Sequence, residues 1–260
     1  MSEQQQVAAS VDEQSLDLVE LADAMTSLAQ RAVDDDGRPA LEELVRVSIE
    51  RVPGARWASL TVLHGRRFTT EAASDEPAVR ADLLQYRIGS GPCVDAVLDD
   101  SVYVTGDVAA DERWPDWGRR VHEELGISSV LSQRLRLLDD SGAVAGLNIY
   151  ADRVDAFSDR AVGMGLVLAT QASLLVTAML ARDRAANLVR ALESNREIGV
   201  AMGILMQRHQ LTREQAFAVL RAASQDSNRK LADIAAEVAD TGILAVRGWA
   251  RTPVGETPSA

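Results

Sequence analysis

The chain is short of the residues that metal sites and thiol chemistry require. It has one cysteine, Cys93, and three histidines among 260 residues. A single cysteine cannot form an internal disulfide, which fits a reducing cytoplasm. The same scarcity argues against a metal site and against a thiol redox cycle, which needs a second, resolving cysteine. No spacing pairs Cys93 with a particular histidine for hydrolysis. We therefore expect no enzymatic activity, no catalytic residues and no metal.

Excess positive charge is also lacking. The net charge of −12 argues against broad electrostatic attraction to nucleic acid or to anionic membranes, and no DNA partner is expected. Residues 187–242 nevertheless contain seven basic and seven acidic residues, so the negative excess lies elsewhere in the chain. A polyanion would have to bind this segment through a local basic patch.

Signals for export and membrane insertion are weak. The first six residues are polar and do not resemble a signal peptide. The 21 residues between Arg160 and Arg182 carry no charge and are long enough to span a bilayer. Glycine, threonine, glutamine and serine interrupt this run, however, and no tryptophan or tyrosine marks its ends. We expect a buried or dimer-forming helix in a cytoplasmic protein without membrane contact.

The apolar pattern before residue 158 predicts an α+β region. Helical periodicity covers residues 10–32, a break follows at 34–39, and a second helix is expected over 41–52. Alternating β-rich segments at 57–63 and 68–72 flank a turn and predict a hairpin. Further strands are expected at 102–105, 130–138 and 144–150, the last two joined by a turn at 139–142, with helices at 78–85, 94–98 and 114–125 between strands. This order predicts a mainly antiparallel sheet with flanking helices.

A long helix is predicted to begin after Ser158, which is a good N-cap. No strong breaker occurs before His209, so the helix would run for about 50 residues, or about 75 Å. Such a helix has too little of its own domain to pack against, and we expect it to pair with a second copy of the chain. The residues expected to contribute to that seam are Leu168, Ala172, Leu175, Met179, Ala186 and Val189.

The last quarter reads as a small helical module. Thr212 and Gln215 have the spacing of a capping box at the start of a short helix. Ser227 or Asn228 is expected to cap the last helix, which ends near Gly242. The residues expected in its core are Ile198, Leu205, Met206, Phe217, Leu220 and Ile234.

The spacing of the apolar and small residues in this module resembles the ANTAR domain, a three-helix RNA-binding module of bacterial antitermination regulators. The matching residues are Ile198, Ala201, Gly203, Leu205, Met206, Ala216, Phe217, Leu220, Arg221, Asn228, Leu231, Ile234 and Ala235. Met202 departs from the family, in which many members carry Lys or Gln at this place. The resemblance implies binding to paired RNA hairpins in nascent transcripts.

Residues from about 41 to 182 resemble the GAF domain, a ligand-sensing α/β fold. The segments that carry the resemblance are Gly89–Asp95, Gly146–Tyr150 and Ala156–Phe157. The order of a GAF and then an ANTAR domain is typical of actinobacterial regulators. We therefore divide the chain into an N-terminal helix and linker (1–37), a sensor domain (38–182), an RNA-binding domain joined to it by a coiled-coil-like helix (183–245) and a disordered tail (246–260).

The candidate RNA-binding residues are the cations of the module. They are Arg196, Arg208, His209, Arg213, Arg221, Arg229 and Lys230. Surface arginines are common on solvated helix faces, so each residue could also serve solubility alone. With Phe217 assigned to the core, base stacking would have to come from arginine planes or from His209.

The candidate ligand-binding residues of the sensor are Gly89, Gly91, Cys93 and Gln133. The glycine-rich loop leads into a helix whose free N–H groups could receive an anion, but it could equally be an ordinary turn. Cys93 there could have a lowered pKa and sense oxidants, or it could be a small buried thiol. An inward Gln133 could contact a ligand or satisfy a buried backbone group. No cofactor is identified beyond an unspecified small molecule.

These patterns favour a signal-responsive transcription antitermination regulator. Its sensor would detect a small ligand or a redox signal and control the presentation of two paired RNA-binding tails. The alternative is a ligand-sensing regulator whose helical tail binds a protein instead of RNA.

Overall fold

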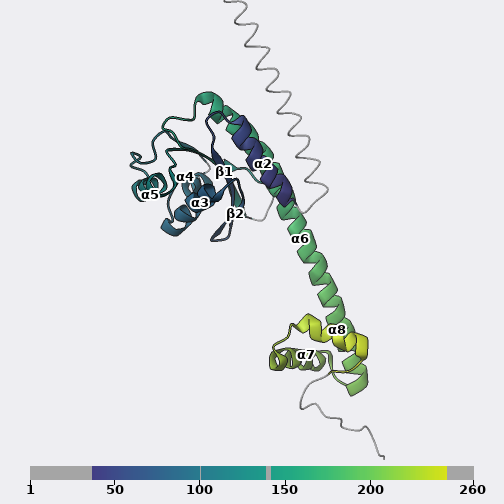
Figure 1. Ribbon diagram of the computed structural model, residues 1–260. Coiled ribbons are helices and arrows are strands. Elements are labelled where there is room, and N and C mark those ends of the chain that lie inside the picture. Colours follow the sequence, from purple (N-terminus) through teal and green to yellow (C-terminus); the bar gives the residue numbers. More distant parts are fainter. Residues whose placement is uncertain (1–36, 100, 139–141, 245–260) are drawn as a thin grey trace, which may run out of the picture. The chain divides into compact units, whose positions relative to one another are not determined.

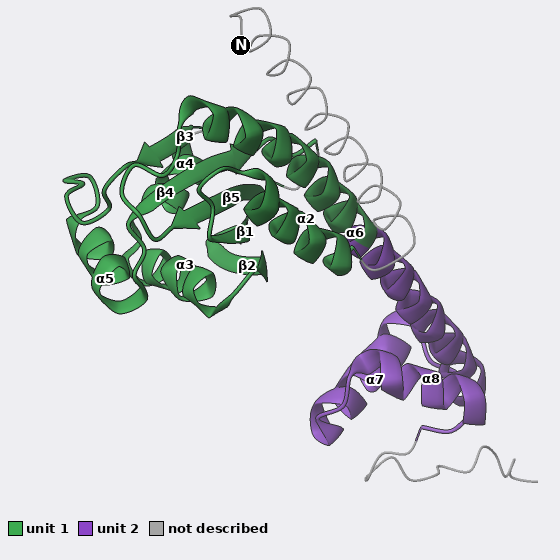
Figure 2. Ribbon diagram, turned by 45° about the horizontal axis from the view of Figure 1, so that its top comes forward, with its two compact units in different colours: residues 1–182 green, residues 183–260 purple. Residues whose placement is uncertain are grey.

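The computed structural model describes residues 37–99, 101–138 and 142–244 (Figure 1). The helix expected over residues 10–32, most of the turn at 139–142 and the tail from 246 lie outside these residues. The chain divides into two compact units, residues 1–182 and 183–260 (Figure 2). Each unit is described by itself.

A five-stranded antiparallel sheet forms the centre of the first unit, in the order β2-β1-β5-β4-β3. The hairpin predicted near the start of the domain is confirmed, because β1 and β2 pair across the turn at Gly65. The strand expected over 130–138 ends three residues earlier, at Leu135. The strands are β1 (Trp57–His64), β2 (Arg67–Ala73), β3 (Val102–Thr105), β4 (Ser129–Leu135) and β5 (Val144–Ala151). The predicted α+β fold with a mainly antiparallel sheet is therefore confirmed.

Two helices cover one face of the sheet, and they run side by side in Figures 1 and 2. They are α2 (Arg38–Arg51) and the first half of α6 (Asp159–His209). Leu60 and Val62 of β1 and Leu147 and Ile149 of β5 point to this face, because alternate residues of a strand share a side. They form one buried cluster with residues of both helices.

The seam expected on the long helix is wrong in its first half. Leu168, Ala172 and Leu175 belong to the core between α6 and the sheet, so they cannot face a second copy. The apolar residues that α6 exposes there are instead Leu166, Val167 and Leu174, which are each about half exposed. By length and composition α6 could cross a membrane, and half of its most apolar 18-residue stretch is buried within the protein.

Three helices cover the opposite face of the sheet. They are α3 (Glu76–Ile88), α4 (Pro92–Asp99) and α5 (Pro115–Leu125), close to the three helices predicted between the strands. Trp117 is buried here and its indole N–H donates to the carbonyl oxygen of Ala81 at 3.1 Å. Val130 and Tyr150 supply the sheet side of this second core.

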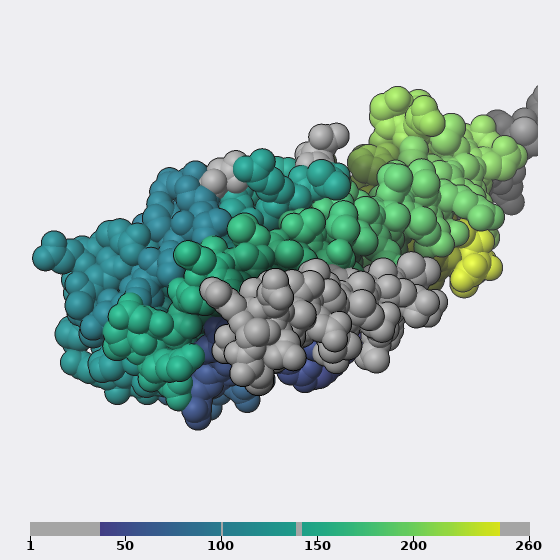
Figure 3. All heavy atoms as spheres, turned by 90° about the horizontal axis from the view of Figure 1, so that it is seen from above, coloured from purple at the N-terminus to yellow at the C-terminus, as the bar shows by residue number. Residues whose placement is uncertain are grey.

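The middle of α6, where the first unit ends, is exposed to solvent. All residues from Ala181 to Glu193 are exposed, including Leu188 and Leu192 at 62% and 61%. Residues of α6 are visible on the surface in the space-filling view (Figure 3, green). The helix begins as expected, with Ser158 Oγ accepting the Ala161 N–H at 3.4 Å.

The second unit is a three-helix module made by the end of α6, α7 (Arg213–Ser227) and α8 (Leu231–Thr241). The predicted capping box is confirmed. Thr212 Oγ1 accepts from the Gln215 N–H at 3.3 Å, and Gln215 Oε1 accepts from the Thr212 N–H at 2.9 Å. The cap expected for the last helix is wrong, because Lys230 is the N-cap of α8, and Asn228 ends α7 in a left-handed conformation with φ of 52°.

Candidate functional site

The second unit has a shared core that fixes its three helices. Leu205 from α6, Leu220 from α7 and Ile234 from α8 are all buried in it. Ile198 and Met206 pack against the same cluster from partly exposed positions. The core predicted for these five residues thus agrees with their packing, and their burial leaves the charged side chains of the module on its surface.

Two of the seven candidate cations hold the module together. Arg208 on α6 donates to the carbonyl oxygen of Gly242, the C-cap of α8. Arg229, between α7 and α8, forms an ion pair with Glu237 at 2.7 Å. Both side chains are exposed but engaged within the unit, so substituting them would also disturb contacts between helices.

Two other cations lie on one side of α7. Arg213 and Arg221 are exposed, eight residues apart, and form no ion pair within the described residues. Phe217 stands midway between them. It is 40% exposed and lies outside the buried cluster, so its expected place in the core is wrong. Ala216, Leu220 and Ala223 form the buried side of α7 and leave no place for it there.

The remaining three candidates are spread over the unit. Lys230 is exposed at the start of α8, next to Arg229. His209 is exposed at the end of α6, and Arg196 is exposed about three turns earlier on the same helix. The structure therefore groups some of the predicted residues around α7 and the α7–α8 turn, and places Arg196 apart from them along α6.

In the first unit, the glycine-rich loop is closed by a side chain. Gln85 Oε1 accepts the Cys93 N–H at 2.7 Å, at the start of α4. A Cβ on Gly91 would lie 2.4 Å from that oxygen, and Gly91 has φ of 153°, so glycine is required here. Gly89 is the left-handed C-cap of α3. The loop thus acts as a turn, and one of the helix N–H groups expected to receive an anion already has a partner.

Cys93 and Gln133, predicted as parts of one ligand site, lie on opposite faces of the sheet. Gln133 points to the α6 side, where its Nε2 donates to the Val162 carbonyl oxygen at 3.4 Å. Cys93 is fully buried on the other side, beside Leu63 and Val97. Burial and the nearby Asp82 raise the pKa of the Cys93 thiol to about 12. The thiol is therefore protonated at neutral pH, the opposite of the lowered pKa that oxidant sensing requires.

Sequence reasoning missed a buried polar cluster on the helix-covered face opposite α6. Its centre is Asp82 of α3, which is fully buried. Four neutral groups donate to the carboxylate at 2.6 to 3.1 Å, namely the side chains of Ser59, Thr70, Asn148 and Tyr150. Burial raises the pKa of Asp82 from 3.8 to about 6, although the four hydrogen bonds act in the opposite direction. No cation faces this carboxylate among the described residues.

Tyr86 extends this cluster toward the β2 edge. Its hydroxyl lies 2.7 Å from Thr61 Oγ1 and 3.0 Å from Thr70 Oγ1. Its ring stacks on Phe68 with centroids 5.1 Å apart. Burial is the main reason that the pKa of Tyr86 is raised, so the hydroxyl stays protonated and available as a donor.

Two buried acceptors near Asp82 have no hydrogen-bonding partner within the described residues. They are Asn148 Oδ1 of β5 and Ser132 Oγ of β4, on directly paired residues of neighbouring strands. Buried polar groups are nearly always satisfied, so these two atoms are places for an ordered water or for a polar group of a bound molecule. The sequence signal was the polar alternation of Ser59 and Thr61 in an otherwise apolar strand.

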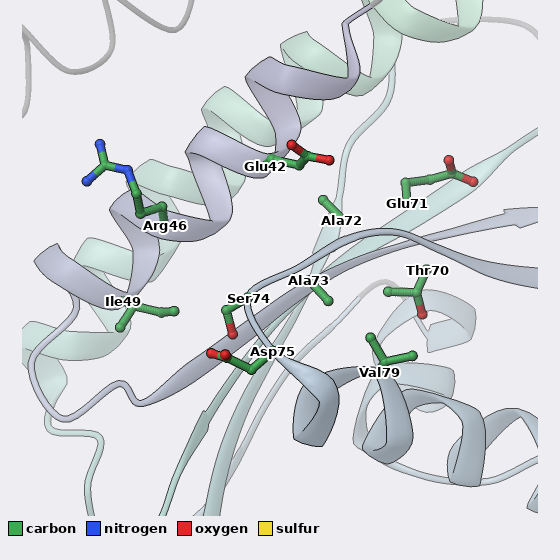
Figure 4. A pocket seen from close by; sticks show the side chains of 10 residues that line it. All are labelled: Glu42, Arg46, Ile49, Thr70, Glu71, Ala72, Ala73, Ser74, Asp75 and Val79. Atoms are coloured by element: carbon green, nitrogen blue, oxygen red, sulfur yellow. The ribbon is translucent and has the colours of Figure 1, made fainter.

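A surface hollow of about 580 Å³ opens at the edge of the sheet (Figure 4). Glu42, Arg46 and Ile49 of α2 line one side, and the end of β2 lines the other. Thr70 belongs to both the hollow and the buried cluster, because its hydroxyl donates to Asp82 Oδ2 at 2.9 Å. Thr70 is thus the residue by which the buried cluster borders the hollow.

Comparison with protein families gives two matches. The GAF domain model matches residues 15–177, and the ANTAR domain model matches residues 186–238. The two matches meet close to the division between the compact units at residue 182. A comparison with curated proteins returned no match.

Comparison with solved structures gives matches of low identity over part of the chain. A type II free methionine-R-sulfoxide reductase from Thermoplasma acidophilum is 20% identical, covers 54% of this chain and 91% of its own, and has a TM-score of 0.43. The free methionine-R-sulfoxide reductase from Neisseria meningitidis, solved with its substrate, is 14% identical over 61% and 89%, with a TM-score of 0.46. The GAF domain of a Coxiella burnetii phosphoenolpyruvate-protein phosphotransferase is 16% identical over 64% and 96%, with a TM-score of 0.47.

Proposed function

Because this chain belongs to the GAF domain family and ends in an ANTAR domain, we propose that it is a cytoplasmic transcription antiterminator controlled by a small ligand. The first unit senses the ligand. The second unit binds paired hairpins in nascent RNA and keeps them from folding into a terminator. The protein has no catalytic role in this scheme.

The observation that carries the RNA-binding part is the exposed pair Arg213 and Arg221 on α7. Neither guanidinium is committed to an ion pair within the described residues, so both are available for phosphate oxygens. They are two exposed positive charges on one side of a helix in a chain whose net charge is −12. Arginine and lysine contacts to phosphates supply most of the salt-dependent affinity for nucleic acid.

The ligand part rests on the polar cluster around Asp82. A ligand that donates hydrogen bonds to Asn148 Oδ1 and Ser132 Oγ would satisfy two buried acceptors. The raised pKa and full burial of Cys93 favour this non-covalent sensing over thiol chemistry. The ligand would therefore be a small polar molecule with at least two donor groups.

Pairing of two chains rests on the exposed apolar residues of α6. Val167, Leu174, Leu188 and Leu192 are each at least 45% exposed and follow one another at intervals of seven, fourteen and four residues. These intervals keep them on one side of the helix, as in a coiled-coil seam. Two linked RNA-binding units would bind two hairpins with a raised effective concentration.

The test is fluorescence anisotropy with the full-length protein and an RNA of two hairpins whose small loops are first selected from a randomised pool. Arg213→Gln combined with Arg221→Gln should raise the Kd and reduce the steepness of its salt dependence by about one to two units of log Kd per log salt. A matched control is Arg66→Gln combined with Arg67→Gln, which removes two exposed cations of the first unit. Substitutions of Arg208 and Arg229 are less suitable because those side chains hold α8 in place.

Selection that yields no RNA binder would contradict the proposal. If no RNA binds and a protein that binds residues 183–260 is found, the alternative is supported, namely a regulator that acts through protein contacts. If the double variant binds RNA as tightly as the wild type, the protein binds RNA but the assignment of Arg213 and Arg221 as its phosphate contacts is wrong.

A further inference from the structure

Phe217 is the residue of the second unit whose position the core does not explain. It is the only Phe, Tyr or Trp between residues 183 and 244, and 40% of its surface is exposed. Single apolar side chains on a protein surface are common. Exposure alone therefore assigns no role to Phe217, and its neighbours decide the question.

The neighbours of Phe217 along α7 are cations. Arg213 precedes it by four residues and Arg221 follows it by four, within a continuous helix. Residues four apart lie on the same side of a helix, with Cβ atoms about 5–6 Å apart. Arg213, Phe217 and Arg221 thus form a continuous exposed row, which we call the Phe217 row.

The turn between α7 and α8 places Lys230 near the end of this row, beside Arg229, whose own charge is paired with Glu237. Ser224, seven residues after Phe217, donates from Oγ to the Arg229 carbonyl oxygen at 2.6 Å. Its own carbonyl oxygen accepts the Arg229 N–H at 3.2 Å. These bonds hold Arg229 and the exposed Lys230 against the end of α7. Glu214 is the acidic residue nearest the row in sequence.

An aromatic ring between cations suits an unpaired base of RNA. A base that leaves its stack in a small loop can be placed on an aromatic face, while cations on either side bind the phosphates that flank it. Duplex RNA would leave the ring without a partner, because a duplex keeps its bases stacked. Protein interfaces are also enriched in aromatic residues and arginine, so the experiment below has an outcome for a protein contact.

We propose that Phe217 is a stacking platform for one loop base of the RNA, with Arg213 and Arg221 binding the flanking phosphates. The inference rests on the proposed RNA-binding function and deepens it. It assigns loop recognition to the middle of α7, and it gives an aromatic residue the role that sequence reasoning left to arginine or His209.

The experiment compares Phe217→Leu with Phe217→Trp in the full-length protein, using the selected two-hairpin RNA. Leucine keeps the apolar bulk and removes the ring, whereas tryptophan keeps a ring. The Kd of Phe217→Leu should rise about 5- to 150-fold, the range for loss of one base–aromatic stack, and Phe217→Trp should bind within about threefold of the wild type. The salt slope should stay unchanged in both variants, because no phosphate contact is lost.

The matched control is Ile243→Ala, another exposed apolar residue of the same unit at 57% exposure. Its Kd should equal that of the wild type. A second measurement does not depend on any variant: wild-type protein is titrated with RNAs that carry an abasic site at each loop position in turn. An abasic site at one loop position should lower the affinity of the RNA for the wild type, and the same abasic site should not lower its affinity for Phe217→Leu any further.

Three results would overturn the inference. One is a Phe217→Leu variant that is folded by circular dichroism and binds RNA like the wild type. Another is an abasic scan in which every position affects wild type and Phe217→Leu equally. The third is a Phe217→Leu variant that loses self-association in sedimentation and regains RNA affinity at high protein concentration, which would make Phe217 a protein contact. Failure of the wild type to bind any selected RNA would instead refute the proposed function itself.

Discussion

Asp82 offers a direct test of the buried polar cluster through the pH dependence of stability. Its carboxylate is fully buried, no cation lies beside it in the part of the chain that the structure describes, and burial raises its pKa from 3.8 to about 6. A raised pKa in the folded state means that the folded protein binds the proton more tightly than the unfolded chain. The stabilisation from protonated Asp82 is complete below pH 3.8 and is lost as the pH rises through 6.

The size of the effect follows from these two pKa values. Between pH 7.5 and pH 5.0, protonation of Asp82 should add about 1.4 kcal/mol to the free energy of unfolding. Asp82→Asn removes the titration and leaves an amide that can rotate to donate to Thr70 Oγ1. The variant should therefore lack this gain, whatever its absolute stability.

The assay is urea unfolding of the wild type and the variant at pH 5.0 and 7.5, followed by tryptophan fluorescence. Three of the four tryptophans, including the buried Trp114 and Trp117, belong to the first unit, so the signal reports mainly that unit. The control is Asp116→Asn, an exposed carboxyl on α5, which should keep the full wild-type gain. Equal pH dependence in the wild type and Asp82→Asn would refute the assignment of a buried, uncompensated carboxylate.

Four further substitutions test the packing, the helix cap and the pairing of two chains. Gly118→Ala would place a Cβ 1.8 Å from the Val108 carbonyl oxygen and should lower the free energy of unfolding by about 3 kcal/mol. Gly163 has open space around it, so Gly163→Ala should raise the free energy of unfolding by about 0.5–1 kcal/mol. Urea titrations of the two variants measure both changes. Thr212→Ala removes the capping box and should cost about 1 kcal/mol in the second unit, measured by thermal circular dichroism. Leu192→Gln should leave folding intact but weaken self-association in sedimentation, and an unchanged dimer would exclude this side of α6 as the seam.

The strands and helices could be predicted wherever one local rule determined them. The hairpin of β1 and β2 followed from period-two alternation around a glycine turn, and the start of α7 followed from the spacing of Thr212 and Gln215. Both depend on residues close in sequence. The strand order β2-β1-β5-β4-β3 depends on pairings between distant segments, which the local pattern does not contain.

The errors concerned residues whose surroundings are set by packing. The long helix has no charged residue between Arg160 and Arg182, so no polar stripe marked which side contacts the sheet, and Leu168 was assigned to the wrong face. Phe217 was placed in the core because it is aromatic, yet smaller neighbours fill the buried side of α7. Asp82 was missed because its four donors come from three strands that meet only in the folded sheet.

In the proposed scheme, a signal from the polar cluster would have to cross the sheet to reach α6, and β5 is the strand that contacts both. Asn148 faces the cluster, and its neighbours Leu147 and Ile149 face the core that contains the first half of α6. Satisfying the two unpaired acceptors would recover about 1–3 kcal/mol each, or about 2–6 kcal/mol together. Moving a two-state equilibrium from 1:99 to 99:1 requires about 5.5 kcal/mol of differential binding. A ligand that bonds both atoms in only one of two states of β5 would thus supply between about a third and all of the free energy that such a switch needs.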